Sequence, residues 1–343
     1  MDFLKEDFLD QLRAEIDEET GRVIIEAAEF TPQQILQEIS EITFNEAFEE
    51  WKLNRKEANL EKAEEIIGEN NNRNRFNTLK TRFESCAVIP FVGAGLSMSS
   101  GYSGWTSYLH NLVGESDADR DEFTRLMGEF EYEAAAQLIF DAMGHARFNE
   151  ELENEYGQDR TITGPIRLLP YLFKTGVITT NFDSVLKRCF DDSSKPFDEV
   201  LLGQESVELQ RYLGEEKKIL VKLHGKATSA NSRILTQNEY DKHYENDEVL
   251  KRCIKAITCK TLLFIGCSLG SDRTIKKMKE IVAAEGHDCM PRHYAFMRLD
   301  EEIDRVARAH ELAEANIYPI WYTDDHDQSI EALLQKMAED VEI

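Results

Sequence analysis

Six short apolar segments constrain the fold of this chain more than any other feature. They are rich in Val, Ile, Leu and Phe and do not alternate with polar residues. Unbroken apolar runs of this length are typical of strands buried on both faces, and helical segments between them predict a doubly wound, mostly parallel α/β sheet. Pro90 interrupts the first segment and removes one ladder donor. The expected strands are 86–92, 175–180, 218–223, 260–266, 292–297 and 317–322.

The segments outside these strands predict two helical regions. Residues 1–75 contain 20 Asp and Glu against 9 Lys and Arg, and their apolar residues recur at helical spacing. A short strand or hairpin is expected near 22–30, and 69–75 has the composition of a loop. We therefore expect a helical N-terminal extension over 1–75 and a second domain over 76–343, with a helical subdomain around 118–165.

The composition argues against several classes of protein. The net charge of −26 disfavours direct binding of nucleic acid, which needs clustered Lys and Arg. No run of about 18 apolar residues occurs, and the N-terminus is acidic where a signal peptide would be basic, so we expect a cytoplasmic protein with no membrane partner. The six cysteines form no C-x-x-C pair, which favours reduced thiols and disfavours a structural zinc site.

Glycine and polar residues directly follow four of the expected strands. They form the segments 93–97 (GAGLS), 179–183 (TTNFD), 224–226 (HGK) and 266–272 (GCSLGSD). In a parallel sheet the carboxyl ends of the strands lie along one edge, and ligands bind in the crevice outside that edge. The four segments therefore predict one shared cleft.

The glycines of this cleft favour a phosphate-bearing ligand. Gly93 and Gly95 would let backbone N–H groups approach an anion, and Ser97 would add a hydroxyl. Gly266 and Ser268 would contact the other half of a dinucleotide. No lysine follows the first glycines in the pattern of a P-loop, which argues against an ATPase of that type.

Three further side chains could perform chemistry there. His224 is the histidine that the strand ends place in the cleft, and imidazole is the natural general base near neutral pH. Asn181 could orient a water or hold a ribose hydroxyl, and Asp183 could accept a hydrogen bond from a carboxamide.

Each feature also has a plainer structural interpretation. A G-A-G sequence after a strand is often only a tight turn, and a His-Gly pair is often a turn or core element. Asn181 and Asp183 could simply cap a helix over 184–190. The individual residues leave both interpretations open.

Taken together, the four segments resemble the sirtuin family over roughly residues 80–340. The family has a G-A-G-x-S loop, a T-x-N-x-D segment, a catalytic H-G pair and a later G-x-S, and this chain has all four in that order. The resemblance implies a Rossmann-like, sirtuin-type fold, with NAD as the substrate and Asn181 and His224 as the catalytic pair. The NAD-binding residues that it implies are Gly93, Ala94, Gly95, Ser97, Thr180, Asp183, Gly266 and Ser268.

Two departures from the protein-deacylating sirtuins indicate a particular branch. Those enzymes carry two zinc-binding C-x-x-C pairs after the catalytic histidine, and residues 226–259 contain none. They also carry a D-F-R element where this chain has 101–109 without an arginine. The combination resembles the zinc-free, NAD-hydrolysing branch of bacterial anti-phage defence systems. That resemblance implies an NAD glycohydrolase that depletes NAD, a homo-oligomer, and a separate partner protein such as a HerA-family ATPase.

Two other functions remain open at this point. One is an NAD-dependent protein deacylase, against which the missing cysteines argue. The other is a non-catalytic module that binds NAD or ADP-ribose, which would have no need of a base such as His224. Residues 1–75 are expected to serve self-association or docking to a partner.

Overall fold

The computed structural model of the chain forms two compact units, residues 1–64 and 65–343. The candidate site lies in the second unit. The described residues are 2–14, 23–25, 28–30, 41–244, 248–270, 273–300 and 303–340.

The first unit is held by a cluster of aromatic rings. It contains helix α1 (Asp2–Ala14), an antiparallel hairpin of β1 (Val23–Ile25) and β2 (Ala28–Phe30), and most of the long helix α3 (Glu41–Gly68). The hairpin expected near 22–30 is thus confirmed. The ring of Phe8 on α1 lies 5.5–5.6 Å from three rings on α3, and ring pairs of this kind stabilise beyond the area they bury. Those rings belong to Phe44, Phe48 and Trp51.

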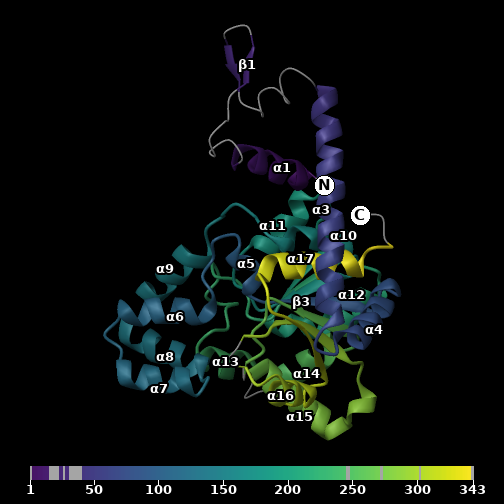
Figure 1. Ribbon diagram of the computed structural model, residues 1–343. Helices are drawn as coiled ribbons and strands as arrows, with labels where there is room; N and C mark the ends of the chain where they lie inside the picture. The colour runs from purple at the N-terminus through teal and green to yellow at the C-terminus, as the bar shows by residue number, and fades with distance from the viewer. Residues whose placement is uncertain are drawn as a thin grey trace. The chain divides into compact units, whose positions relative to one another are not determined.

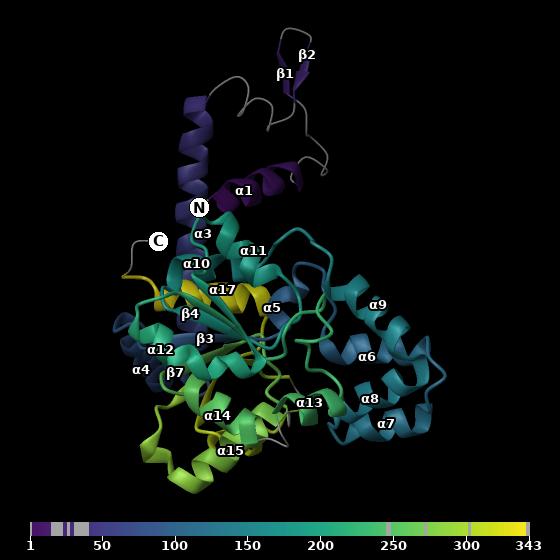
Figure 2. The ribbon, with the colours of Figure 1, turned by 180° about the vertical axis from the view of Figure 1, so that it is seen from behind.

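The second unit is built on a seven-stranded sheet in which every strand pair is parallel (Figures 1 and 2). The strand order is β5-β6-β4-β3-β7-β8-β9, so the chain enters at the centre and winds outwards to both edges. The doubly wound α/β fold is therefore confirmed. Six strands lie on the predicted apolar segments: β3 (Val88–Val92), β4 (Gly176–Thr179), β6 (Ile219–Lys222), β7 (Thr261–Ile265), β8 (His293–Arg298) and β9 (Ile317–Tyr322).

The seventh strand, β5 (Glu199–Leu202), was not predicted. It lies at the sheet edge and pairs only with β6. Of its four residues only Leu201 is fully buried. An edge strand with one buried residue does not produce the apolar run that marks the other six.

Pro90 lies in the central strand β3 without breaking it. Gly93 donates its N–H to the carbonyl of Ile265 on β7, so alternation along the strand turns Pro90 towards β4. Pairing between β3 and β4 begins only at Phe91.

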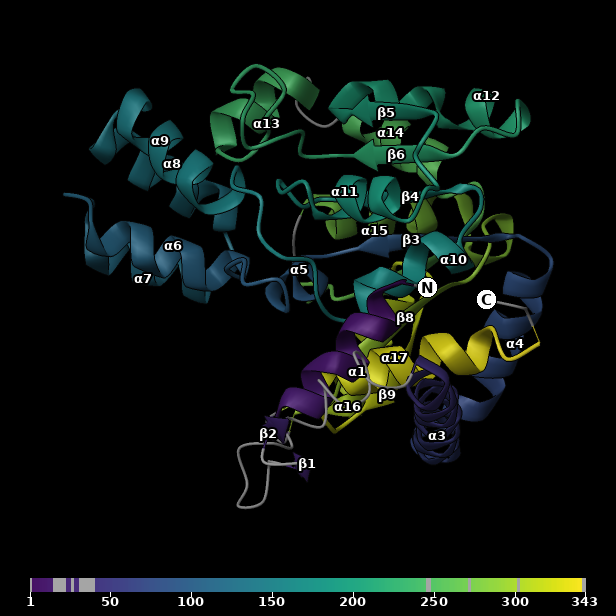
Figure 3. The same cartoon turned by 90° about the horizontal axis from the view of Figure 1, so that it is seen from above.

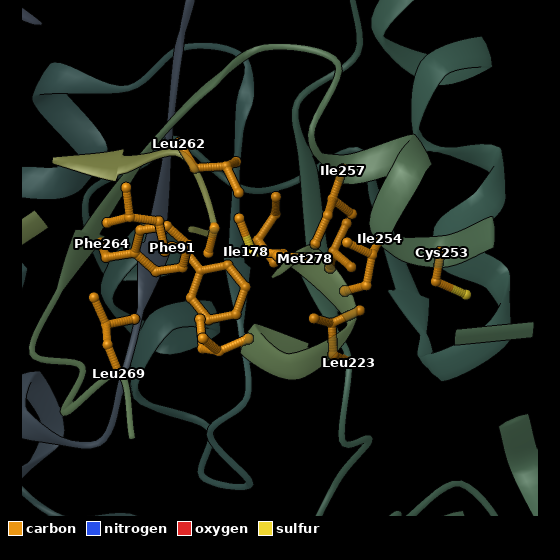
Figure 4. Packing of buried hydrophobic residues seen from close by; sticks show 14 of the residues in the cluster. Phe91, Ile178, Leu223, Cys253, Ile254, Ile257, Leu262, Phe264, Leu269 and Met278 are labelled. Carbon is orange, nitrogen blue, oxygen red and sulfur yellow. The ribbon is translucent and has the colours of Figure 1, made fainter. Parts of the chain in front are cut away.

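Helices cover both faces of the sheet. Figure 1 shows α10 (Leu169–Leu172), α11 (Val185–Asp192) and α17 (His326–Met337) on one side, with α14 (Glu248–Ile257) and α15 (Arg273–Glu285) on the other. Figure 4 shows the core between the sheet and the second group. There the rings of Phe91 and Phe264 lie 4.8 Å apart, and side chains from α14 and α15 pack near them. Further helices are α12 (Leu209–Gly214), α13 (Gln237–Tyr244) and α16 (Arg305–Ala313).

The long connection from β3 to β4 begins with a single helical turn, α5 (Gly95–Met98), and continues into a group of helices beside the sheet (Figure 3). Phe130, at a φ of 59°, separates the second and third helices of that group. The group consists of α6 (Trp105–Gly114), α7 (Arg120–Gly128), α8 (Tyr132–Met143) and α9 (His145–Tyr156).

The loop predicted over 69–75 is shorter than expected, because α4 begins at Asn72 and runs to Glu84. The fully buried amide of Asn72 donates to the carbonyls of Ile66 and Trp321, and its oxygen accepts from the N–H of Trp321. This anchor to β9 fixes the start of the helix, and a local sequence pattern does not reveal it. No helix among the described residues has the length and apolar content needed to traverse a bilayer.

Candidate functional site

The four predicted segments line one cavity of about 830 Å³ at the carboxyl ends of β3, β4, β6 and β7. Its volume lies within the range of roughly 300–1,000 Å³ that small-molecule and cofactor sites occupy. The helical insert and the ends of β8 and β9 supply the remaining walls. All the candidate site residues lie on it: Gly93, Ala94, Gly95, Ser97, Thr180, Asn181, Asp183, His224, Gly266 and Ser268.

The glycine loop is shaped by close packing against the end of β7. Gly93 and Gly95 donate their N–H groups to the carbonyls of Ile265 and Gly266, each at 2.9 Å. A Cβ on Gly93 would lie 2.4 Å from the Gly266 oxygen, so no side chain fits. These two amides are therefore not the anion donors that the sequence suggested. The amide of Ala94, between them, donates to no backbone carbonyl of the described residues.

Asn181 is fixed by the glycine loop. Its side-chain nitrogen donates to the carbonyl of Gly93 at 3.0 Å and to the hydroxyl of Ser97 at 3.1 Å, and its backbone N–H donates to the Thr179 hydroxyl at 3.0 Å. Both amide hydrogens are thus used within the protein. The side-chain oxygen is left to accept a hydrogen bond from a ligand or water. Ser97 consequently orients Asn181, a role that the sequence did not suggest.

His224 faces the hydroxyl of Tyr240, which lies 2.6 Å from Nε2. Burial lowers the pKa of His224 to about 4, so the imidazole is neutral at pH 7 and can accept a proton. Tyr240 lies on α13, where Arg273 of α15 stacks over its ring at 4.9 Å. Tyr240 could not be predicted from the sequence, because its approach to His224 depends on the path of the intervening loop.

Asp183 combines a structural role with a possible ligand contact. Its Oδ1 accepts from the N–H of Val185 at 3.0 Å, so the helix-capping interpretation holds for this oxygen. The side chain is only 5% exposed and lines the cavity.

Lys222, which was not predicted as a site residue, holds the loop that follows β4. Its buried ammonium group donates to the carbonyls of Phe182, at 3.2 Å, and Asp183. Burial lowers the pKa of Lys222 to about 8, although the neighbouring Asp183 acts in the opposite direction. Lys222 therefore ties the end of β6 to the segment that carries Asn181.

An aromatic wall borders Asp183. The ring of Phe182 lies 5.8 Å from that of Trp105 and 6.1 Å from that of Tyr156. These side chains come from the helical insert and from the loop after β4, and all three line the cavity. They provide an apolar surface against which a flat ring could pack.

The cavity is also lined by charged groups. Arg308 on α16 donates to the carbonyl of Ser268 at 3.0 Å and also pairs with Glu311. Arg298, at the end of β8, pairs with Asp300 at 3.0 Å. Among the described residues, no group of three or more His, Cys, Asp or Glu side chains could hold a metal ion.

Comparison with known proteins places these features in a family context. The model of the SIR2-like domain matches residues 175–320, which begins at β4 and leaves the glycine loop outside the match. The NAD(+) hydrolase ThsA of Cytobacillus dafuensis is 27% identical over 224 residues, which is 64% of this chain and 42% of the relative. Proteins of the same name from Acinetobacter baumannii and Enterococcus faecium are 25% and 26% identical over 61% of this chain.

The chain spans less than half the length of these relatives, since each match covers 42% of the relative. The domain match spans three of the four segments, 179–183, 224–226 and 266–272, and runs from β4 into β9. The resemblance predicted from the sequence is therefore confirmed for residues 175–320, which match the SIR2-like domain.

Proposed function

We propose that this chain is an NAD glycohydrolase, which cleaves NAD to nicotinamide and ADP-ribose. The observation that carries the proposal is the presence of Asn181 and a neutral His224 in one cavity with the glycine loop. The name NAD(+) hydrolase, which the relatives bear, supports the same reaction.

In this proposal NAD lies across the carboxyl ends of the strands. Its diphosphate lies over the loop 93–97, where the Ala94 amide has no backbone acceptor among the described residues. Its nicotinamide ring packs on the aromatic wall of Trp105, Tyr156 and Phe182. The carboxamide then lies near Asp183, whose Oδ2 can accept one of its N–H groups.

Cleavage proceeds through an oxocarbenium-like ribose as the bond to nicotinamide lengthens. A water adds to the anomeric carbon, nicotinamide leaves with the electrons of the broken bond, and one proton is released. Neutral His224 accepts that proton from the attacking water or from a ribose hydroxyl. The side-chain oxygen of Asn181 accepts a hydrogen bond from the water and fixes its position. General-base help of this kind contributes roughly 10²–10⁴-fold, in addition to the effect of positioning.

The biological proposal follows from the same reaction. An enzyme that hydrolyses cytoplasmic NAD would starve an infected cell of the cofactor, as an effector of bacterial anti-phage defence. Such activity needs restraint, which we assign to homo-oligomerisation or to a separate partner such as a HerA-family ATPase. The N-terminal residues 1–75, with their excess of acidic side chains, are the proposed site of assembly.

Product analysis tests the reaction directly. The full chain is incubated with NAD, with and without the protein encoded beside it, and the products are separated by chromatography. Free ADP-ribose and nicotinamide in equal amounts are expected. Acyl-ADP-ribose formed only with an acylated peptide would indicate a deacylase instead. Tight binding of NAD without any loss of it would indicate a binding module.

A further inference from the structure

A second histidine, His326, lines the same cavity from an element that none of the four motifs contains. It is the first residue of α17, directly after the last strand of the sheet. The mechanism proposed above does not use it.

The ring of His326 is oriented from one side by Tyr322. The Tyr322 hydroxyl lies 2.5 Å from Nδ1 and has no other acceptor among the described residues, so it donates to that nitrogen. Burial lowers the pKa of His326, which keeps the imidazole neutral at pH 7. A neutral imidazole that accepts at Nδ1 carries its proton on Nε2. His326 therefore presents an N–H donor from Nε2.

The Nε2 donor is directed at the glycine loop. A Cβ placed on Gly95 would lie 3.1 Å from Nε2. This nitrogen is buried and has no hydrogen-bond partner among the described residues. Buried donors are almost always paired, because leaving one unpaired costs free energy, so this one calls for an acceptor that the protein itself does not supply.

A second donor of the same kind lies in the loop itself. The amide of Ala94 has no backbone acceptor among the described residues, whereas the amides of Gly93 and Gly95 on either side of it are both bonded. Ala94 and His326 both line the cavity. Two donors without protein acceptors, one in the loop and one against it, indicate a ligand with more than one acceptor oxygen.

We infer that His326 is a further dinucleotide-binding residue, whose Nε2 donates a hydrogen bond to an oxygen of the diphosphate over the glycine loop. The inference rests on the proposed function for the identity of the dinucleotide. ADP-ribose, the expected product, carries the same diphosphate and serves as a ligand that is not consumed. Tyr322 acts through His326, because it fixes the ring and the position of the proton.

Calorimetric titration of the full chain with ADP-ribose and with adenosine tests the inference. His326→Leu removes the donor and should weaken binding of ADP-ribose roughly tenfold or more, since hydrogen bonds to charged groups are among the stronger ones. Binding of adenosine, which lacks phosphate, should change little. His326→Gln, whose amide can place an N–H near the position of Nε2, should restore most of the loss. The exposed His310→Leu on α16 is the matched control.

Kinetics provide a second readout. His326→Leu should raise KM for NAD while kcat stays within about threefold, because the contact is made equally in the ground and transition states. A merely structural histidine would not produce this split. Tyr322→Phe keeps the ring of His326 and should weaken ADP-ribose binding by a smaller factor. It replaces His326→Leu as the test variant if His326→Leu does not fold.

The possible outcomes separate the inference from the proposed function. Binding of ADP-ribose unchanged in both His326→Leu and Tyr322→Phe overturns the inference alone. Equal weakening of adenosine and ADP-ribose also overturns it, because the contact would then be to the nucleoside. If the wild-type chain binds ADP-ribose but never cleaves NAD, the proposed function fails and the binding data still decide the role of His326. If it neither binds ADP-ribose nor cleaves NAD, both fail.

Discussion

Two walls of the cavity are constructed in different ways. The glycine wall, residues 93–97 with 266–268, consists of backbone from β3 and β7 in direct contact. The histidine wall, His224 with Tyr240, consists of side chains from the loop after β6 and from α13 that meet through one hydrogen bond of 2.6 Å. The first wall has no room for an added methyl group, whereas the second can lose an atom without a clash.

The difference predicts how each wall responds to mutation. Changes in the glycine wall should act on folding and on ligand binding together, because the two strand ends cannot separate independently. Changes in the histidine wall should act on proton transfer while the fold persists. The predictions below are ordered by the size of the expected effect.

Gly93→Ala should have the largest effect. The new Cβ would lie 2.4 Å from the Gly266 oxygen and 2.9 Å from the Cys267 Cα, so β3 and β7 must separate at their ends. We expect the free energy of unfolding to fall by more than about 2 kcal/mol, measured by urea denaturation, and ADP-ribose binding to be lost.

Gly128→Ala is the matched control, because an added Cβ at this last residue of α7 meets nothing within 4 Å. Its free energy of unfolding should stay within about 0.5 kcal/mol of the wild type. If Gly93→Ala has the stability and ADP-ribose binding of the wild type, the glycine wall can accommodate an added side chain, and the contrast with the histidine wall is wrong.

Ser97→Ala should have a smaller effect, on catalysis more than on folding, because it adds no atom to the glycine wall. It removes the hydroxyl that accepts from Asn181 at 3.1 Å and leaves one buried amide hydrogen unpaired. Such a loss costs about 1–3 kcal/mol, which corresponds to a decrease in the rate of nicotinamide release of roughly 5- to 150-fold. Ser85→Ala, at the exposed C-cap position directly after α4, should leave the rate unchanged. An unchanged rate in Ser97→Ala would mean that Gly93 alone suffices to orient Asn181.

Tyr240→Phe should alter the pH profile more than the maximal rate. If Nδ1 of His224 is the proton acceptor, Nε2 carries the hydrogen and donates to the Tyr240 hydroxyl. This contact favours the protonated imidazole, so its removal should shift the acid limb of the kcat profile to lower pH. We expect kcat at pH 7.5 to change by less than about fivefold. Tyr212→Phe on α12 controls for the loss of a hydroxyl elsewhere. An unshifted acid limb would show that Tyr240 does not influence the protonation of His224 during the reaction.

The wild-type rate should change little between pH 8 and pH 6. The pKa of His224 is lowered from 6.5 to about 4, so the base stays neutral throughout this interval. The unfolded chain binds a proton at this site more readily than the folded chain does. Its contribution to stability is therefore fully present above pH 6.5 and decreases as the pH falls towards 4. Nicotinamide release measured at constant ionic strength checks the first point, and a steep loss near pH 6.5 would contradict it.

Much of the fold could be predicted because burial on both faces leaves a direct mark on sequence. The six unbroken apolar runs correspond to the six strands that lie between other strands or under helices. The clustering of Asn181, His224 and the glycines followed from topology alone, since parallel strands bring their carboxyl ends to one edge. No side-chain detail was needed for that step.

The side chains that tune the site could not be predicted in this way. Tyr240 reaches His224 only because the chain reverses after Gly225, which has a φ of 73° and packs against the carbonyl of Ser232. Lys222 is the last residue of a buried strand, and His326 approaches from the far end of the chain. Contacts of this kind depend on loop paths and on distant elements, which hydrophobic periodicity does not encode.

The most direct test of the account compares NAD cleavage by the wild type, Asn181→Ala and His224→Ala, with ADP-ribose binding measured on the same preparations. The account predicts release of nicotinamide and ADP-ribose by the wild type. It also predicts a loss of roughly 100-fold or more in both variants while ADP-ribose still binds, since general-base help contributes about 10²–10⁴-fold. Full turnover in either variant would contradict the account.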